Sequence, residues 1–361
     1  MRILITTYQG GLAGSTQSIY YLAKGLAEKG HDVFLGCRTE RWIALLAANS
    51  GIQIVPMRMK GKYSLEAIKE HRDVIRKYNI ELVNAQSSID RYLPIFSKWL
   101  YGGNFRIVHT RRQRPASVGG FLQNFIYHKG TDRIVAVSRG VKNSLVGLGL
   151  KEQHIEVIHN GLDAKKMEVI DAANVPLLRA KHQIPDHHKI IGCISRFKEQ
   201  QQIVDALEYV TVPCTLILVG VEEEQVEVNL SNTIHRVLCT GLIDNEAALQ
   251  YYPLFDVKVL ASSMEGLSQS LLEAMSMGIL VIATNASGNP DLIQHNENGF
   301  LFEGGNIKQL GEQMQQVLTD KHLHNRLANA GKATVDTHFS IQRTVEQYEQ
   351  LFLKLIGGTG I

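Results

Sequence analysis

The feature of this sequence that most constrains its fold is an alternation of short apolar runs with longer amphipathic runs. Buried apolar runs of this length predict strands, and the amphipathic runs between them predict helices. In the first half the predicted strands are RILITTY (2–8), DVFLGC (32–37), IQIVPM (52–57), IELVNA (80–85), FRIVHT (105–110) and DRIVAVS (132–138). The predicted helices there include 18–30, 64–79 and 140–149. Strands separated by helices pair in parallel through right-handed crossovers, so this half predicts a doubly wound α/β domain.

The second half repeats the same alternation. Its predicted strands are KIIGCIS (189–195), CTLILVG (214–220), HRVLCTG (235–241), FDVKVLAS (255–262) and LVIATN (280–285), with a helix expected after each of the first four. At 361 residues the chain is long enough for two domains. The sequence therefore predicts two Rossmann-like domains, 1–164 and 165–339, whose strand ends face a central cleft. The last run, 340–361, is predicted to be a helix that crosses back to the first domain.

The formal net charge of +3 hides an asymmetry between the two halves. Residues 1–160 carry 23 Lys and Arg against 11 Asp and Glu, whereas the rest of the chain carries 15 against 24. A basic first half suits nucleic acid, an anionic membrane surface or a phosphorylated acceptor. Solvated Lys and Arg on helix faces are the alternative explanation.

Cysteine and histidine usage argues against a disulfide framework and against a metal centre. Cys37, Cys193, Cys214 and Cys239 lie singly in or beside apolar runs, without CxxC spacing, so we expect reduced core residues. No pair among the 14 histidines shares a recognisable helix or strand face. The N-terminus has no apolar signal region and no segment long enough to span a bilayer. We therefore expect a cytoplasmic protein, and peripheral contact with the inner face of the cell membrane is an alternative.

The segment MEGLSQSLLEAMSMG (264–278) places two carboxylates eight residues apart. Glu265 follows a predicted buried strand, and Glu273 lies on the second turn of a helix that is expected to begin near Leu267 or Ser268. The N-terminal amides of such a helix suit a diphosphate. Glu273 can then accept hydrogen bonds from a ribose, and Glu265 from a second polyol. Acidic residues that only complement the helix dipole are the alternative.

A glycine turn, QGGLAGSTQS (9–18), follows the first predicted strand. Its glycines Gly10, Gly11 and Gly14 allow the backbone to turn sharply into a helix whose amides can hold an anion or an acceptor group. We assign Gly14 to the binding of a donor molecule, and Gly10 and Gly11 to the binding of an acceptor molecule. A plain tight turn is the alternative.

Several of these motifs together resemble glycosyltransferase family 4, the group 1 retaining enzymes of the GT-B fold. The resemblance rests on the glycine turn, GLAEKGHDV, VAVS, VIHNGLD, the EGLSQSLLEAM block, VIATNASGNPDLI and NENGFLF, and it covers nearly the whole chain. It implies an N-terminal acceptor-binding domain and a C-terminal donor-binding domain, with no metal.

The resemblance also implies roles for single residues. Glu265 would contact the donor sugar, Glu273 the ribose, and Arg196 the diphosphate. The backbone amides of Gly266, Leu267, Ser268 and Gln269 would hold the sugar and phosphates. The family usually has Lys and then Gly beginning five residues after this Arg, whereas this chain has Gln201 and Gln202, so Lys198 is expected to supply the missing charge.

The first half departs from the family pattern as well. Asn84 and Gln86 stand where many relatives have paired histidines. Beyond the fifth strand, where relatives often have a catalytic-site His, Arg112 is the residue nearest to that position. We expect Arg111, Arg112 and Arg114, together with His109 and Gln86, to orient a phosphate or carboxylate of the acceptor, and a solvated loop is the alternative. The following segment, 117–127, is predicted to be a core helix, with lipid contact as the alternative.

The sequence thus predicts a retaining hexosyltransferase that uses a nucleotide diphosphate sugar as substrate and needs no cofactor. Its acceptor would be a sugar, a lipid-linked compound or another anionic molecule of polysaccharide, lipopolysaccharide or glycolipid synthesis, and no nucleic acid is expected. A nucleotide-sugar epimerase, a phosphorylase, and a non-catalytic sugar-nucleotide-binding protein remain alternatives. A phosphorylase would need a pyridoxal-bearing Lys, for which no candidate is evident.

Overall fold

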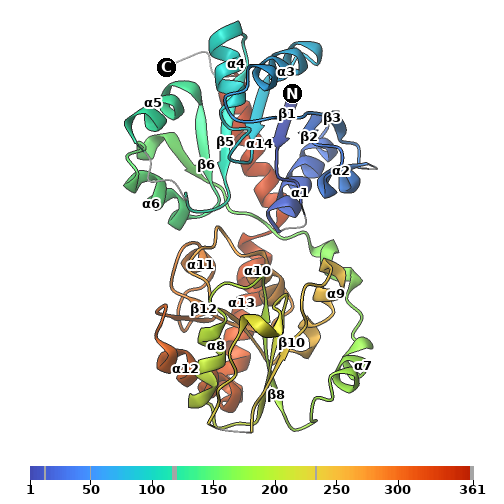
Figure 1. The fold of residues 1–361 in the computed structure, drawn as a ribbon, viewed down its shortest axis with the longest axis vertical. Coiled ribbons are helices and arrows are strands. Elements are labelled where there is room, and N and C mark those ends of the chain that lie inside the picture. The colour runs from blue at the N-terminus through green and yellow to red at the C-terminus, as the bar shows by residue number, and fades with distance from the viewer. Residues whose placement is uncertain (12–13, 49, 116–119, 232–233, 358–361) are drawn as a thin grey trace. The chain divides into compact units, whose positions relative to one another are not determined.

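The computed structural model describes residues 1–11, 14–48, 50–115, 120–231 and 234–357. The chain forms two compact units, one of Met1–Gly161 with Ile341–Ile361 and the other of Leu162–Ser340 (Figure 1). The first boundary lies close to residue 164, where the sequence suggests it. Among the described residues, no helix is long and apolar enough to cross a membrane.

The first unit is built on a seven-stranded sheet with the order β3-β2-β1-β4-β5-β6-β7, in which all neighbours are parallel. Its strands are β1 (Arg2–Thr7), β2 (Asp32–Cys37), β3 (Gln53–Pro56), β4 (Leu82–Ala85), β5 (Arg106–Arg111), β6 (Arg133–Ala136) and β7 (Ile155–Val157). The strand order reverses direction between β1 and β4. At such a point the loops on either side of the carboxyl ends separate, which leaves room for a ligand.

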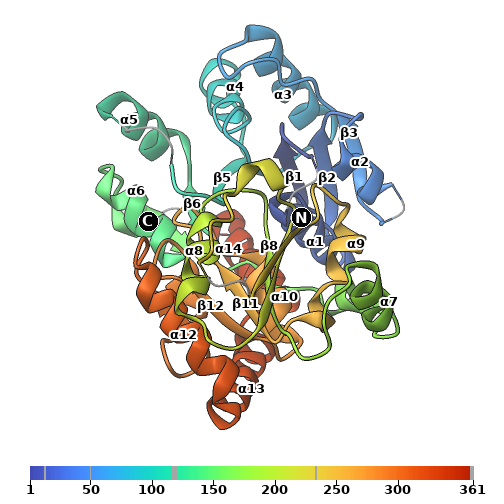
Figure 2. The same cartoon turned by 60° about the horizontal axis from the view of Figure 1, so that its bottom comes forward.

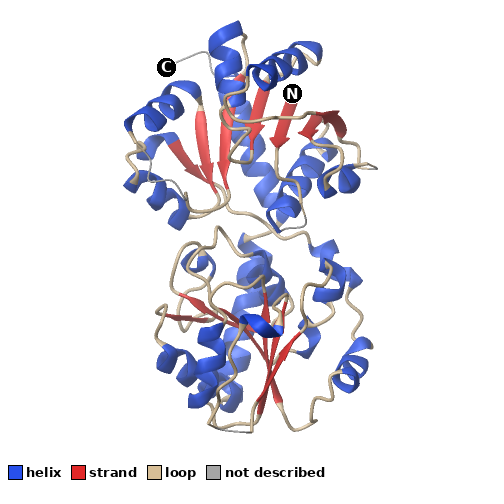
Figure 3. Cartoon of the chain, in the orientation of Figure 1, coloured by secondary structure: helices blue, strands red, loops and turns tan. Residues whose placement is uncertain are grey.

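Helices cover both faces of this sheet, as the blue ribbons around the red strands show (Figure 3). They are α1 (Gly14–Glu28), α2 (Trp42–Ala47), α3 (Leu65–Lys77), α4 (Leu93–Tyr101), α5 (Phe121–Gly130), α6 (Arg139–Gly147) and α14 (Ile341–Gly357). A short 3-10 turn, η1 (Glu152–His154), comes directly before β7. Ser64 and Ser138 cap α3 and α6, since each side chain accepts a hydrogen bond from a backbone amide of the first turn.

The second unit holds a six-stranded parallel sheet with the order β10-β9-β8-β11-β12-β13. Its strands are β8 (Lys189–Ile194), β9 (Cys214–Val219), β10 (Arg236–Cys239), β11 (Val257–Leu260), β12 (Leu280–Thr284) and β13 (Phe300–Phe302). The order reverses between β8 and β11. Both units therefore show the doubly wound arrangement that the sequence predicts.

The helices of the second unit are α7 (Asn174–Lys181), α8 (Gln201–Ala206), α9 (Asn245–Leu249), α10 (Gln269–Ser276), α11 (Asn289–Leu292), α12 (Ile307–Thr319) and α13 (Lys321–His338). Its 3-10 turns are η2 (Ala164–Val169), η3 (Leu207–Tyr209), η4 (Glu223–Gln225) and η5 (Tyr252–Leu254). Apolar side chains from β8, β9, β11 and β12 form one core with α8 and α12.

The C-terminal helix α14 belongs to the first unit. Val345, Tyr348 and Phe352 are buried in the same core as Ile19, Leu22 and the central strands. Figures 1 and 2 both show α14 lying beside α1. A Cβ on Gly25 of α1 would come within 2.5 Å of Val345 Cγ2, so the absence of a side chain at Gly25 allows the two helices to approach closely.

One prediction from the sequence is wrong, and another holds only in part. Between β9 and β10 the described residues form no α-helix but the 3-10 turn η4, in which Gln225 Oε1 accepts a hydrogen bond from the Glu222 amide at 2.9 Å. In the described part of the segment 117–127 only the end of the run is in the core: α5 begins at Phe121, which is 88% exposed, and Leu122 is 70% exposed, whereas Ile126 and Tyr127 are buried. Residues 117–119 lie outside the described residues.

The cysteines follow the expectation in three of four cases. All four are free thiols, and Cys37, Cys193 and Cys214 are buried. Burial raises the pKa of the Cys214 thiol to about 12, which keeps it protonated. Cys239, on the edge strand β10, is only partly buried.

Candidate functional site

The point where the second sheet reverses brings together the loops that follow β8 and β11. The β8 loop contains Arg196 and Lys198, and the β11 loop leads through Glu265 into α10. The helix begins at Gln269, and the Ser268 hydroxyl caps it by accepting a hydrogen bond from the amide of Leu271 at 3.4 Å. The predicted start near Leu267 or Ser268 is therefore correct within two residues.

Glu265 and Lys198 form an ion pair between these two loops. The Lys198 ammonium donates to Glu265 Oε1, and the Glu265 side chain is mostly buried while that of Lys198 is about a third exposed. A second link joins the same loops, because Glu199 Oε1 accepts from the amide of Ser263 at 3.2 Å. The structure thus brings Lys198 beside Glu265, two residues that the sequence assigns to phosphate and sugar.

Gln200 shapes the loop that carries Arg196. Its buried amide donates to Ser195 Oγ at 2.5 Å and to the Arg196 carbonyl at 2.8 Å, and it accepts from the Lys198 amide at 2.5 Å. Gln201, where the family usually has Lys, donates to Asp205 and to the Glu227 carbonyl, at 2.8 Å each. Gln201 therefore holds a neighbouring loop and brings no charge to this region.

Glu273 lies inside the second unit and already has partners for both carboxylate oxygens. It is 5% exposed; Oε1 accepts from Lys166 Nζ at 2.5 Å and Oε2 from the Tyr252 hydroxyl at 2.7 Å. Lys166 is 8% exposed and Tyr252 is fully buried. Burial and the nearby Glu273 charge raise the pKa of Tyr252 well above its usual range. The expectation of a carboxylate that faces an open cleft has to be corrected: in this structure its oxygens bond to Lys166 and Tyr252.

A further buried cation lies beneath the loops. Lys258 interrupts the apolar strand β11, is fully buried, and donates to the carbonyl of Ile194, the last residue of β8, at 3.2 Å. Burial lowers the pKa of Lys258. A charged residue inside an apolar strand was a visible signal in the sequence that our predictions did not use.

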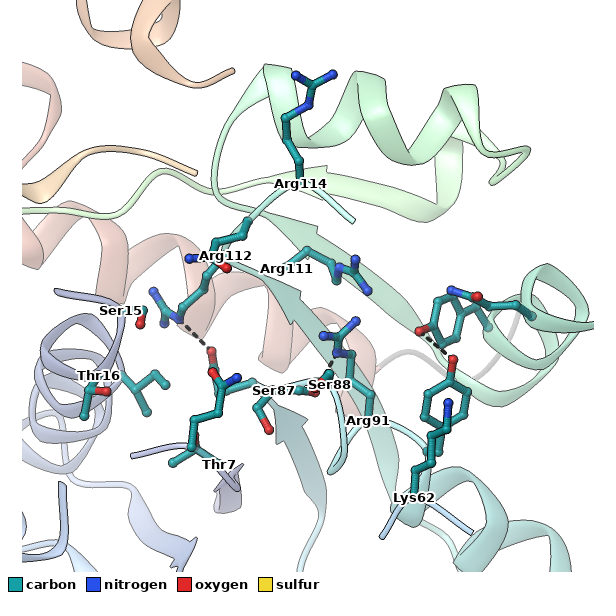
Figure 4. Close-up of a pocket in the computed structure, with 17 residues that line it drawn as sticks. Thr7, Ser15, Thr16, Lys62, Ser87, Ser88, Arg91, Arg111, Arg112 and Arg114 are labelled. Atoms are coloured by element: carbon teal, nitrogen blue, oxygen red, sulfur yellow. Dashed lines mark hydrogen bonds between the residues drawn. The ribbon is translucent and has the colours of Figure 1, made fainter. Parts of the chain in front are cut away.

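The reversal point of the first sheet contains a cavity of about 380 Å³ (Figure 4). It is bounded by the carboxyl ends of β1, β4 and β5, by the first turn of α1 and by α5. Its lining residues are Thr7, Gln9, Ser15, Thr16, Ile19, Lys62, Gln86, Ser87, Ser88, Arg91, Tyr92, Arg111, Arg112, Gln113, Arg114, Gln123 and Tyr127. Five of these residues are cationic and none is acidic, so the cavity is strongly positive.

The arginines of this cavity have different partners. Arg112 donates from Nε to Gln86 Oε1 at 3.0 Å and from Nη1 to Asn160 Oδ1 at 2.6 Å. Arg114 donates to Ser144 Oγ at 3.0 Å, and Arg91 to the Ser87 carbonyl at 2.6 Å. Arg111 is 7% exposed, and its side chain has no hydrogen-bond or ion-pair partner within the part of the chain that the structure describes.

The residues behind the cavity are neutral or internally satisfied. Asn84 accepts from Gln86 Nε2 and from Thr110 Oγ1, so both residues that replace the family's histidines are held in place. Asp90 accepts from Thr6 Oγ1 at 3.0 Å and from the amides of Gln86 and Ser87. Burial and the neighbouring Arg91 charge hold the pKa of His109 well below its usual range, and His109 does not line the cavity.

The glycine turn contributes to the cavity through its neighbours. Gln9, Ser15 and Thr16 line it, whereas Gly10, Gly11 and Gly14 do not. Gly10 has a left-handed φ of 55°, its carbonyl accepts from the Ile43 amide at 3.1 Å, and a Cβ there would meet Ile43. Gly10 therefore shapes the turn that packs against α2, and its assignment to the acceptor stays a prediction. Gly14 begins α1, and residues 12 and 13 of the turn lie outside the described residues.

Some residues of these two sites were missed from the sequence. Lys166 and Tyr252 lie far along the chain from Glu273, and Asn160 far from Arg112, so no local pattern pairs them. Arg91 and Lys62 were hidden among many other basic residues of the first half. Asn160 stands in the VIHNGLD segment, which was quoted only for its family resemblance.

Two family models match the chain, one over each half. The model described as Glycosyltransferase Family 4 matches residues 12–166, and the model described as Glycosyl transferases group 1 matches residues 174–334. Together they account for most of the chain. These are the domains that the sequence motifs predict.

Several curated relatives carry glycosyltransferase names. The chain is 26% identical to the N-acetyl-alpha-D-glucosaminyl L-malate synthase of Bacillus anthracis, over 99% of this chain and 97% of the relative. It is 24% identical to the capsular polysaccharide biosynthesis glycosyltransferase CapM of Staphylococcus aureus, over 68% and 70% of the two chains. The expected contact with an anionic membrane stays a prediction.

Solved structures share the fold at low sequence identity. Alr3699/HepE of Anabaena in complex with UDP matches with a TM-score of 0.81 and 18% identity, over 97% of this chain and 99% of that one. A glycosyltransferase of Rickettsia africae matches with a TM-score of 0.82 and 19% identity, over 99% of both chains. The predicted GT-B class of two Rossmann-like domains is thereby confirmed, and with the two family models the chain belongs to the glycosyltransferases that join a family 4 domain to a group 1 domain.

Proposed function

We propose that this glycosyltransferase moves a hexose from a nucleotide diphosphate sugar to an acceptor hydroxyl with retention at the anomeric carbon. The observation that carries the proposal is the group at the reversal point of the second sheet. There the capped N-terminus of α10, the Glu265–Lys198 pair and the β8 loop with Arg196 come from neighbouring strand ends. Helix amides and cations at a sheet reversal suit a diphosphate.

In the proposed reaction the bond between the anomeric carbon and the diphosphate oxygen breaks, and its electron pair leaves with the diphosphate. Arg196, Lys198 and the amides of the α10 N-terminus stabilise that negative charge. The acceptor oxygen bonds to the anomeric carbon on the same face, and its proton passes to a departing phosphate oxygen. Glu265, paired with Lys198, would orient the donor sugar through its hydroxyls.

Glu273 is the proposed contact to the nucleotide ribose. Its carboxylate bonds to Lys166 and Tyr252, so a ribose must share or replace one of these donors. The network then holds the carboxylate in one orientation before the nucleotide binds. The donor is a substrate in this scheme, and we propose that neither a cofactor nor a metal ion is needed.

The relatives indicate where such a reaction operates. Their names include capsular polysaccharide biosynthesis in Staphylococcus aureus and lipopolysaccharide core biosynthesis in Rhizobium meliloti, while the Bacillus anthracis relative is named for a product with L-malate. The HepE structures hold UDP, and in one case UDP-glucose. We propose a UDP-sugar donor and an acceptor of cell-surface polysaccharide, lipopolysaccharide or glycolipid synthesis.

A thermal-shift panel of UDP-, GDP- and ADP-sugars tests the donor. A ligand at 100 times its dissociation constant adds about 2.7 kcal/mol of stability. We expect UDP-sugars to raise the melting temperature, and Glu273→Gln to reduce the shift while Gln201→Ala leaves it unchanged. If no nucleotide sugar shifts the wild-type transition, the donor assignment is wrong.

A further inference from the structure

The cavity of the first unit contains a buried charge with no counter-charge. Arg111 is at the carboxyl end of β5 and is 7% exposed, and its side chain has no hydrogen-bond or ion-pair partner among the described residues. Burying an unpaired ion is costly in free energy, and such charges in proteins are usually paired. The Arg111 side chain therefore suits an anionic ligand.

Arg91 contributes a second cation to the same part of the cavity. In Figure 4 the labelled Arg111 and Arg91 side chains point toward one another, whereas Arg112 points toward Ser15 and Arg114 points away. Arg91 bonds only to a neutral carbonyl, and none of the five cations that line the cavity is in an ion pair within the described ranges. Two guanidinium groups with no acid between them repel each other, and one doubly negative group would relieve that repulsion.

The other three cations that line the cavity interact with other protein groups. Arg112 is bonded to Gln86 and Asn160, and Arg114 to Ser144. The Lys62 ammonium lies over the rings of Tyr63 and Tyr92, at 5.1 and 5.5 Å from their centroids. Lys62 and the first turn of α1 make the rest of the wall positive, because helix N-termini favour anions.

The cavity is also small and polar. At about 380 Å³ it is near the lower end of the range for small-molecule sites. It accepts a compact group rather than a length of saccharide chain. Its position where the first sheet reverses is the place where ligands bind in open α/β sheets.

We infer that this cavity binds the acceptor through a doubly charged anionic group, a phosphate monoester or two neighbouring carboxylates, held chiefly by Arg111 with Arg91. The inference rests on the proposed function, in which the first unit binds the acceptor. Guanidinium groups bind both kinds of anion in a bidentate manner. The acceptor is a hydroxy compound that carries this group.

Calorimetry on the full chain tests the inference. The dianionic probes are sn-glycerol 3-phosphate and L-malate, with L-lactate as the monoanion and glycerol as the neutral control. We expect the dianions to bind more tightly than lactate or glycerol. Arg111→Gln should weaken dianion binding by roughly 10- to 100-fold, because a hydrogen-bonded charge pair is lost.

Three variants act as controls. Arg114→Gln should change dianion binding by less than about threefold, since Arg114 is bonded to Ser144 away from Arg111. Arg196→Ala, in the second unit, should leave dianion binding intact. Arg111→Lys should retain part of the affinity, because it keeps the charge but not the fork.

The stability of Arg111→Gln without ligand separates a binding role from a structural one. Removal of an unpaired buried charge should leave the melting temperature unchanged or raise it. A lower melting temperature would show that Arg111 supports the fold, and the inference would fail.

Other results would also overturn the inference. Equal binding of glycerol and dianions, unchanged binding in Arg111→Gln, or loss of binding in Arg196→Ala would each contradict it. Binding to phosphatidic acid vesicles but to no soluble dianion would indicate a lipid surface instead. UDP titration in the same variants separates the two proposals: if UDP binds and the dianions do not, only this inference fails, and if the dianions bind and nucleotides do not, the donor assignment fails.

Discussion

Glu273 is the residue whose environment most changes the expectation drawn from sequence. Its helix position suggested a free carboxylate, but the structure shows it between the buried Lys166 ammonium and the Tyr252 hydroxyl. A substitution there acts on stability as well as on nucleotide binding. The variant has to be chosen so that the two effects are separated.

Glu273→Ala should lower the stability of the second unit, because it leaves Lys166 buried and without its carboxylate. Breaking such a pair costs about 3–5 kcal/mol. Glu273→Gln keeps an oxygen acceptor for Lys166 but loses the negative charge, so it should destabilise the fold less than Glu273→Ala and weaken nucleotide binding by roughly 10- to 100-fold. Thermal unfolding and UDP calorimetry measure the two effects. A double variant, Lys166→Met with Glu273→Leu, should recover stability but not binding; recovered binding would remove Glu273 from the donor site.

Arg196 and Lys198 should differ in their kinetic effects. Arg196→Ala is expected to lower kcat and kcat/KM together, because its charge acts on the departing diphosphate. Lys198→Ala should also release Glu265, its ion-pair partner, and so raise KM for the donor. Steady-state kinetics with the donor that the thermal-shift panel identifies makes the comparison. If Arg196→Ala raises only KM, the contact of Arg196 with the diphosphate is as strong in the ground state as in the transition state, and its assigned role is wrong.

The sequence predicted those features of the site that depend on local signals, but not the contacts between segments that lie far apart in the chain. The block from Glu265 to Glu273 could be placed at a strand exit and a helix start, because strand and cap signals are local. The burial of Arg111 and the bond between Lys166 and Glu273 depend on how distant segments pack, and no local spacing encodes them. Of this cluster, the sequence showed only that three arginines lie at the end of β5 and just after it.

At the scale of elements, the central strands and long helices were predictable and the short ones were not. The apolar strands β1, β2, β8 and β9 are buried over nearly their whole length, which gives an unambiguous signal. The short strands β7 and β13 were missed, since a few residues are too short for a period to show. α5 was misjudged because apolar residues at helical spacing do not reveal whether another element covers them.

Because α14 packs closely on α1, a methyl group added at Gly25 should lower the stability of the protein. Gly25→Ala places a Cβ within 2.5 Å of Val345 Cγ2, and such overpacking costs about 1–3 kcal/mol. The control is Gly147→Ala at the end of α6, where a Cβ meets nothing within 4 Å, and where alanine should stabilise by about 0.5–1 kcal/mol. Thermal melts of the two variants should shift in opposite directions. Equal shifts would mean that α14 does not pack on α1 this closely.

A charged contact also ties α14 to the first unit, and its strength should depend on pH. Lys29 Nζ donates to Glu349 Oε2 at 2.7 Å, and His31 Nε2 to Oε1 at 2.9 Å. The hydrogen bond from Lys29 lowers the pKa of Glu349. A carboxyl whose pKa is lowered by folding stabilises the fold above its unfolded pKa, and this stabilisation is lost as pH falls through the folded pKa.

Glu349→Gln should therefore lower the melting temperature at neutral pH, and the difference from wild type should vanish in acid, below the lowered pKa of Glu349. Melting curves of both proteins across this pH range measure the difference. A difference that stays constant with pH would show that Glu349 acts through packing rather than through charge.

At the scale of the whole molecule, the first half is basic and the second half is acidic. This difference fits the proposal that the first half binds an anionic acceptor and the second half the nucleotide sugar. The basic first half contains the cationic cavity, and the acidic second half contains the carboxylates assigned to sugar and ribose. The second unit still places Arg196, Lys198 and the α10 N-terminus at one sheet reversal, where a diphosphate needs local positive charge. A transferase that binds an anionic acceptor and a nucleotide sugar in separate units accounts for both distributions.

The central claim, retaining transfer from a nucleotide sugar, is tested most directly by slow donor hydrolysis, which needs no known acceptor. The full chain is incubated with an α-linked UDP-sugar, and proton NMR follows the anomer of the released sugar before it equilibrates, with Glu265→Gln as control. The account predicts that UDP and the α-anomer appear together, and that Glu265→Gln slows both. Release of the β-anomer first would contradict retention, and no hydrolysis of any nucleotide sugar that binds would favour a non-catalytic protein.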